Sequence, residues 1–133
     1  MVRLIGFSIF VVSFYAFANS ECDTAKPLGF IVACYEGKLK AADAHLNDSY
    51  RNLKSALKLS GYDNQSKESY WSFFVESQRY WIKLRDEQCK AKQAFFENDY
   101  YAQVIEKNKC LIDATNTRSR LLENEVEFIQ NLP

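Results

Sequence analysis

Residues 35–57 read YEGKLKAADAHLNDSYRNLKSAL, and the apolar side chains of this stretch recur at steps of four and three residues. The recurring positions are Tyr35, Leu39, Ala42, Leu46, Tyr50, Leu53 and Leu57. Because an α-helix has 3.6 residues per turn, side chains at this spacing share one face, whereas a strand needs alternation at every second residue. The stretch therefore predicts an amphipathic helix from residue 28 or 29 to residue 60, with Pro27 at its start and Gly61 just after its end.

Two further helical periods follow along the chain. The second run of apolar residues extends from Tyr70 to Phe95 after a short polar loop, with Ser66 as a candidate N-cap, and predicts a helix to about residue 96. The third run begins at Tyr101 and continues nearly to the end of the chain. Since the connecting loops are short, consecutive helices should pack antiparallel. The predicted fold class is all-α, a three-helix antiparallel bundle.

The composition is that of one ordinary globular domain. The chain has 133 residues, of which 47% are hydrophobic and 26% charged, and formal positive and negative charges balance. Two prolines and four glycines disfavour a turn-rich β-sandwich. A single histidine and balanced charge disfavour a metal-rich protein or a nucleic-acid partner. We expect no cofactor.

Residues 1–18 have the layout of a secretory signal peptide. Arg3 provides the positive charge, residues 4–17 form a mainly apolar run, and Ala16 and Ala18 are small residues at the recognition positions. The run is shorter than the roughly 20 residues that a membrane-spanning helix requires. We therefore predict cleavage after Ala18, a domain covering residues 19–133, and a soluble exported protein without stable membrane insertion.

All four cysteines follow this segment, and an exported protein meets conditions that favour disulfide bonds. Their spacing does not suit a zinc site. Two bridges are expected, and four cysteines allow three pairings. In an antiparallel bundle, Cys34 and Cys110 both lie at about the same height along the helices as Cys89. Cys89 could therefore pair with either of them. We favour Cys34 with Cys89 and Cys22 with Cys110, because Cys22 paired with Cys34 would be awkward if Cys34 lies well inside the first helix.

Seven polar residues project onto or beside the apolar faces in two neighbouring layers. The first layer contains Asp43, Arg85, Asp86 and Thr115, and the second contains Asn47, Gln78 and Arg118. Such groups are costly to bury unless they bond to one another. A catalytic carboxylate site is the alternative, but no general base or metal-binding set accompanies it, so we favour a structural polar network. His45 is interpreted as a residue at the edge of the core, with no serine or cysteine partner, and enzymatic activity is not expected.

Aromatic residues crowd the second helix and cannot all face the core. Trp71, Phe73 and Tyr80 cover much of the helix circumference, which makes them a candidate protein-binding patch, the alternative being packing against the N-terminal segment. The loops at residues 61–66 and 97–101 are the other candidate contact sites.

Four ordered blocks contain all four cysteines and span nearly the whole chain after the signal. They are Cys22-x11-Cys34, then Ala42-Asp43-x2-Leu46-Asn47-x2-Tyr50-x2-Leu53, then Gln78-x2-Trp81-x3-Arg85-Asp86-x2-Cys89, and finally Cys110-x4-Thr115-x2-Arg118-x3-Leu122. Together they resemble the lysozyme-inhibitor LprI-like N-terminal domain family. The resemblance implies a small exported helical domain, periplasmic or secreted in a bacterium. The chain departs from the family pattern in having no lipidation cysteine and in having Glu97-Asn98-Asp99-Tyr100 where relatives commonly have a loop rich in glycine and serine.

The namesake of that family is a lipoprotein that inhibits lysozyme, so the resemblance implies a protein-binding module whose partner is a lysozyme or a related peptidoglycan hydrolase. The alternative is a periplasmic envelope-structural, accessory or immunity protein without a lysozyme target. Titration of the purified chain into lysozymes separates these two hypotheses.

Overall fold

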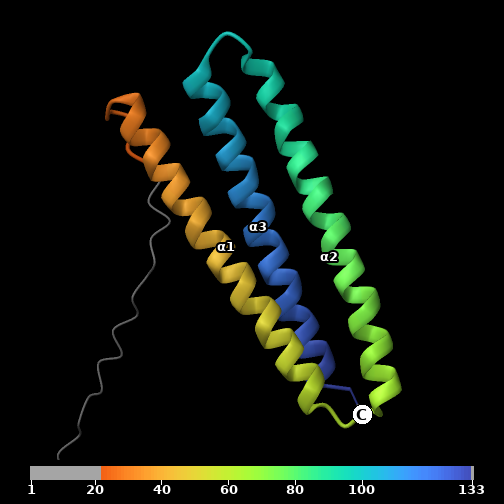
Figure 1. Ribbon diagram of the computed structural model, residues 1–133. Coiled ribbons are helices and arrows are strands. Elements are labelled where there is room, and N and C mark those ends of the chain that lie inside the picture. The colour runs from red at the N-terminus through yellow and green to blue at the C-terminus, as the bar shows by residue number, and fades with distance from the viewer. Residues whose placement is uncertain (1–21, 133) are drawn as a thin grey trace, which may run out of the picture.

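The computed structural model describes residues 22–132, which form three long helices joined by short turns (Figure 1). Helix α1 spans Leu28–Leu59, α2 spans Asn64–Gln93, a short 3-10 helix η1 covers Ala94–Phe96, and α3 spans Tyr100–Gln130. These residues contain no strand. The predicted all-α three-helix bundle is confirmed. The predicted signal peptide and its cleavage position lie outside the described residues.

The turn between α1 and α2 is fixed by side chains at both helix ends. Helix α1 ends at Leu59, and the Ser60 hydroxyl donates a hydrogen bond of 2.8 Å to the Leu57 carbonyl. The N-cap of α2 is Asp63, whose carboxylate accepts from the Ser66 backbone N–H at 2.9 Å and from the Ser66 hydroxyl at 2.7 Å. Both bonds from Ser66 lower the pKa of Asp63. The prediction that Ser66 is the N-cap is therefore wrong: Ser66 lies in the first turn and donates to the cap.

Helix α3 lies between the other two helices (Figure 1). It runs in the same direction as α1 and antiparallel to α2. The main core joins α1 to α3 through Leu46, Leu53 and Leu57 on one side and Leu122 and Ile129 on the other. Helix α2 has a single buried residue, Cys89. The core is thus mainly an α1–α3 interface, and α2 lies alongside with most of its surface exposed.

The structure contains two disulfide bonds, Cys22–Cys34 and Cys89–Cys110. The predicted pairs Cys34–Cys89 and Cys22–Cys110 are wrong. Helices α1 and α2 diverge from their shared turn, and α3 separates them at the end where Cys34 lies, so Cys34 cannot reach Cys89.

A turn just before α1 explains the pairing of Cys22. The Asp23 carboxylate accepts from the Ala25 N–H at 3.0 Å, and the Asp23 carbonyl accepts from the Lys26 N–H at 3.3 Å. This turn reverses the chain, so Cys22 returns alongside the start of α1. Its Cα atom lies 6.0 Å from that of Cys34. The two bridges therefore fasten the N-terminal turn to α1 and α2 to α3.

Within residues 22–132, no helix combines the length and the apolar character needed to cross a membrane.

Each disulfide should contribute about 3 kcal/mol to the free energy of unfolding, because the bridges close loops with sequence separations of 12 and 21 residues. We predict a loss of about that size for the double variant Cys89→Ser/Cys110→Ser and for Cys22→Ser/Cys34→Ser, measured by urea denaturation. Proteolysis without reduction should yield peptides joined as Cys22–Cys34 and Cys89–Cys110. A peptide joining Cys34 to Cys89 would contradict the fold.

Candidate protein-binding surface

The turn between α2 and α3 carries the densest group of exposed aromatic side chains. Phe95 and Tyr100 are 87% and 71% exposed, and Phe96 and Tyr101 are also exposed. We call these four residues the aromatic tip. Large apolar groups that remain in water at one end of a bundle are typical of protein contact sites.

Hydrogen bonds hold the aromatic tip in one conformation. The Gln103 side-chain amide donates to the Phe96 carbonyl at 2.9 Å, and the Gln93 amide donates to the Gln103 side chain at 3.3 Å. The Asp99 carboxylate caps α3 by accepting from the Ala102 N–H at 3.0 Å. The Cys89–Cys110 disulfide closes the hairpin below these bonds. Because the turn is already ordered, a partner that binds it meets a small entropic cost.

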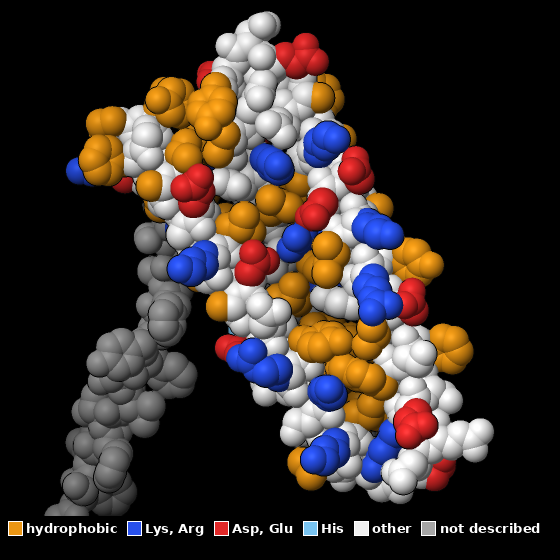
Figure 2. All heavy atoms as spheres, in the orientation of Figure 1, with side chains coloured by type: hydrophobic (Ala, Val, Ile, Leu, Met, Phe, Trp, Pro, Cys, Tyr) orange, Lys and Arg blue, Asp and Glu red, His pale blue; other side chains and the backbone are white. Residues whose placement is uncertain are grey.

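The predicted patch of Trp71, Phe73 and Tyr80 is divided between two sides of α2. The Trp71 ring packs against the ring of Tyr50 on α1, with 5.0 Å between centroids, and is partly buried. Phe73 and Tyr80 point outward and are exposed. Figure 2 shows hydrophobic side chains projecting at intervals along the outer edge of α2. Trp71 therefore belongs to the packing of α1 on α2, and only the other two remain available to a partner.

The first polar layer converges on Arg85 of α2. Its guanidinium donates to Asp43 of α1 at 3.4 Å, to Thr115 of α3 at 3.1 Å and to Asp86 at 2.9 Å. The Arg85 side chain is only 15% exposed. The structure thus brings all four residues of this layer together, and one guanidinium links the three helices. With its donors directed at these partners, Arg85 is placed to hold the helices together.

The second polar layer is smaller than predicted. Arg118 of α3 donates from Nε to the Gln78 side chain at 2.9 Å, and its guanidinium lies over the rings of Phe74 and Trp81. Burial lowers the pKa of Arg118. Asn47 does not join this layer, because it lies on the exposed side of α1.

A cluster that the sequence interpretation missed joins α1 to the C-terminal half of α3. Glu123 lies 3.0 Å from the His45 Nε2 atom and 3.2 Å from the Ser49 hydroxyl, and Ser49 is buried. Ser49 follows His45 by four residues, one helical turn, so the prediction that His45 has no serine partner on its face is wrong, and this spacing could have revealed the cluster. The Ser49 hydroxyl donates to the Glu123 carboxylate and to the His45 backbone carbonyl, the latter at 3.1 Å, so its proton is directed at these oxygens and not at the His45 ring. The cluster connects helices and does not form a hydrolytic triad.

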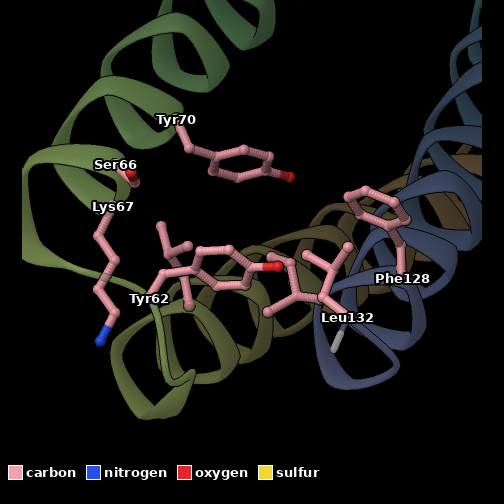
Figure 3. Close-up of a pocket in the computed structure, with 8 residues that line it drawn as sticks. Tyr62, Ser66, Lys67, Tyr70, Phe128 and Leu132 are labelled. Carbon is pink, nitrogen blue, oxygen red and sulfur yellow. The ribbon is translucent and has the colours of Figure 1, made fainter.

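An apolar pocket of about 180 Å³ lies at the opposite end of the bundle, between the α1–α2 turn and the end of α3 (Figure 3). Tyr62 and Tyr70 point across it toward Leu132 and Phe128. Its lining consists of Leu57, Tyr62, Ser66, Lys67, Tyr70, Phe128, Ile129 and Leu132. The Lys67 ammonium donates to the Lys58 carbonyl at 3.1 Å, at the edge of the pocket. The lining contains no acidic residue, so it offers no pair of carboxylates for acid–base chemistry.

Among the described residues, no group of three or more His, Cys, Asp or Glu side chains is placed to hold a metal ion.

A family model described as lysozyme inhibitor LprI matches residues 18–122. The match covers most of the chain and includes all four cysteines and both polar layers. The chain belongs to the LprI family. Neither the curated proteins nor the solved structures contain a match to it.

The LprI motif residues named from the sequence lie mostly where the helices meet. The cysteines form the two disulfides, and Arg85 and Arg118 form the interhelical bonds described above. The aromatic tip lies between the third and fourth motif blocks, so it is separate from the residues that hold this LprI fold together.

If the Arg85 layer is structural, Arg85→Ala should lower the free energy of unfolding by about 2 kcal/mol, since it leaves Asp43 and Thr115 without their partner. Arg79→Ala is the matched control on the same helix, because Arg79 forms an exposed pair with Glu76, and it should cost less than about 0.5 kcal/mol. Chemical denaturation measures both. Equal losses in the two variants would contradict the structural role.

Tyr70 should make the stability fall at high pH. Burial, together with the hydrogen bond to Glu125, raises the pKa of Tyr70 far above its ordinary value of about 10. A raised pKa in the folded state favours the protonated form, so this contribution is complete below about pH 10 and is lost as the pH rises further. We predict that Tyr70→Phe flattens this fall in the free energy of unfolding, whereas Tyr80→Phe, at an exposed position, leaves it unchanged. Identical pH profiles for wild type and Tyr70→Phe would count against the assignment.

Proposed function

We propose that this LprI-family protein is an exported inhibitor that binds a lysozyme or a related peptidoglycan hydrolase through its aromatic tip. The observation that carries the proposal is the exposure of Phe95 and Tyr100 on a turn that hydrogen bonds and a disulfide hold in place. The family membership supports the class of target. On this proposal the protein acts stoichiometrically and catalyses no reaction.

The shape of the hairpin end supports a target with a substrate cleft. Glycoside hydrolases place two carboxyl groups on either side of the bond that they cleave, in a site that binds a sugar chain. A narrow hairpin turn can enter such a site, with Phe95 and Tyr100 supplying apolar contact. The exposed Asn98 amide at the centre of the turn can donate hydrogen bonds to a carboxylate. With balanced formal charge, the chain gains little electrostatic steering, so tight binding would depend on contact at the tip.

Export is part of the same proposal. Two disulfides persist in oxidising compartments such as the periplasm or the extracellular space. We propose that residues 1–18 are removed as a signal peptide and that residues 19–133 act there as the soluble inhibitor.

The proposal predicts that Phe95→Ala/Tyr100→Ala weakens inhibition at least about tenfold, because truncating exposed aromatic anchors typically costs more than 1 kcal/mol each. Phe128→Ala is the matched control: Phe128 is an exposed aromatic at the opposite end of the bundle, and this variant should inhibit like the wild type. The measurement is residual hydrolysis of bacterial cell walls by c-type and g-type lysozymes titrated with each variant.

Circular dichroism of both variants checks that the fold is retained. Full lysozyme activity at a large molar excess of the wild-type chain would end the lysozyme proposal and leave the envelope-structural or immunity role. Inhibition that survives the Phe95→Ala/Tyr100→Ala change would keep the function but move the contact away from the tip.

A further inference from the structure

Helix α2 has an apolar edge that neither α1 nor α3 covers. Phe73, Tyr80 and Leu84 are 77%, 67% and 56% exposed, and Ser77 is exposed between them. Steps of four, three and four residues place these side chains in one line, about 16 Å long, on the helix surface. We call these four residues the α2 edge. Scattered exposed hydrophobic residues are common, but a line at the spacing of a coiled-coil seam is typical of a helix that packs against another helix.

We propose that the α2 edge is the interface of a symmetric dimer, in which α2 packs antiparallel against α2 of a second copy. A twofold axis near residues 78 and 79 brings Phe73 of each chain opposite Leu84 of the other. The same axis brings Ser77 of each chain opposite Tyr80 of the other. The small Ser77 leaves room for the Tyr80 ring, and Phe73 gains apolar contact with Leu84, as in the interdigitated packing of two helices. The interface is isologous, as twofold dimers require.

Charges beside the α2 edge favour a second copy in this orientation. Glu76 and Lys83 border the edge on the same side, seven residues apart, and both are exposed; the Glu76 carboxylate also accepts from Arg79 of its own chain at 2.6 Å, which leaves its second oxygen for a partner. In the antiparallel arrangement, Glu76 of each chain lies beside Lys83 of the other, which gives two opposite-charge contacts by symmetry. In a parallel arrangement, Glu76 and Lys83 would instead face the opposite flank of the other helix, near Trp81 and Gln88, and would gain no opposite-charge contact. On the other side of the edge, the exposed Gln88 is uncharged and adds no repulsion.

The dimer would carry one aromatic tip at each end. Because α2 rises about 1.5 Å per residue, the antiparallel axis separates the two Phe95 residues by about 50 Å along the helices. The two tips would therefore be free to bind two partner molecules at once. Dimer formation does not depend on what the tips bind, so it can be tested separately from the proposed function.

The first test is the molar mass of the purified chain after signal removal, measured by light scattering and by sedimentation over a range of concentrations. We expect a mass twice that of the chain at high concentration. Leu84→Asp should give a monomer, because it places two carboxylates in the apolar interface. Leu59→Asp is the matched control, since Leu59 is exposed on α1 and its substitution should leave the dimer intact.

The second test exchanges the charges. Glu76→Lys and Lys83→Glu should each weaken the dimer about tenfold, because each change replaces two attractive contacts by two repulsive ones. A mixture of the two variants should form heterodimers preferentially, since both charge contacts become attractive again only between unlike chains. A chain that is monomeric at every concentration overturns the proposal. It is equally overturned by a dimer that neither Leu84→Asp nor the charge changes affect, or by an α2 edge covered only by a different protein.

Discussion

The attachment of α2 to α3 is the constraint on which the rest of the structure depends. Helix α2 has 30 residues and a single buried one, Cys89, which forms a disulfide bond with Cys110 on α3. Apolar burial, the usual source of helix packing energy, mainly joins α1 to α3. Helix α2 is therefore held by a disulfide, by the Arg85 and Arg118 hydrogen bonds and by the aromatic contacts around Trp71 and Phe74. This arrangement explains how a helix can be fixed in place while most of its surface faces water.

Fastening a helix in this way separates the residues that hold the fold from those that can meet a partner. The cysteines and the Arg85 layer occupy the sides of the helices that face one another, and most of them lie in the LprI motif blocks. The aromatic tip and the α2 edge occupy the surface that these links leave uncovered. A rigid module of this kind can change its contact residues without disturbing its interior.

Helix periods and loop lengths predicted the three helices closely, because each apolar run is long and ends at a clear turn. The Arg85 layer could also be predicted from the sequence. In a helical hairpin, counting residues from the turn shows which positions of the two helices lie at the same height. The disulfide pairing could not, because it depends on the lateral spread of α1 from α2 and on the Asp23 turn, and neither is visible in a periodic pattern. The prediction that Asn47 joins the second polar layer was wrong for a related reason. Its height along α1 matches that of the layer, but it lies on the side of α1 that faces solvent.

Native-state hydrogen exchange with and without the Cys89–Cys110 bond tests the central claim most directly, because it reports the local stability of each helix separately. If the bond and the polar contacts hold α2 in place of a broad apolar core, its loss in Cys89→Ser/Cys110→Ser should make the amides of α2 exchange much faster, while those at the α1–α3 core keep their protection. Equal loss of protection in all three helices, or unchanged protection of α2, would contradict the account.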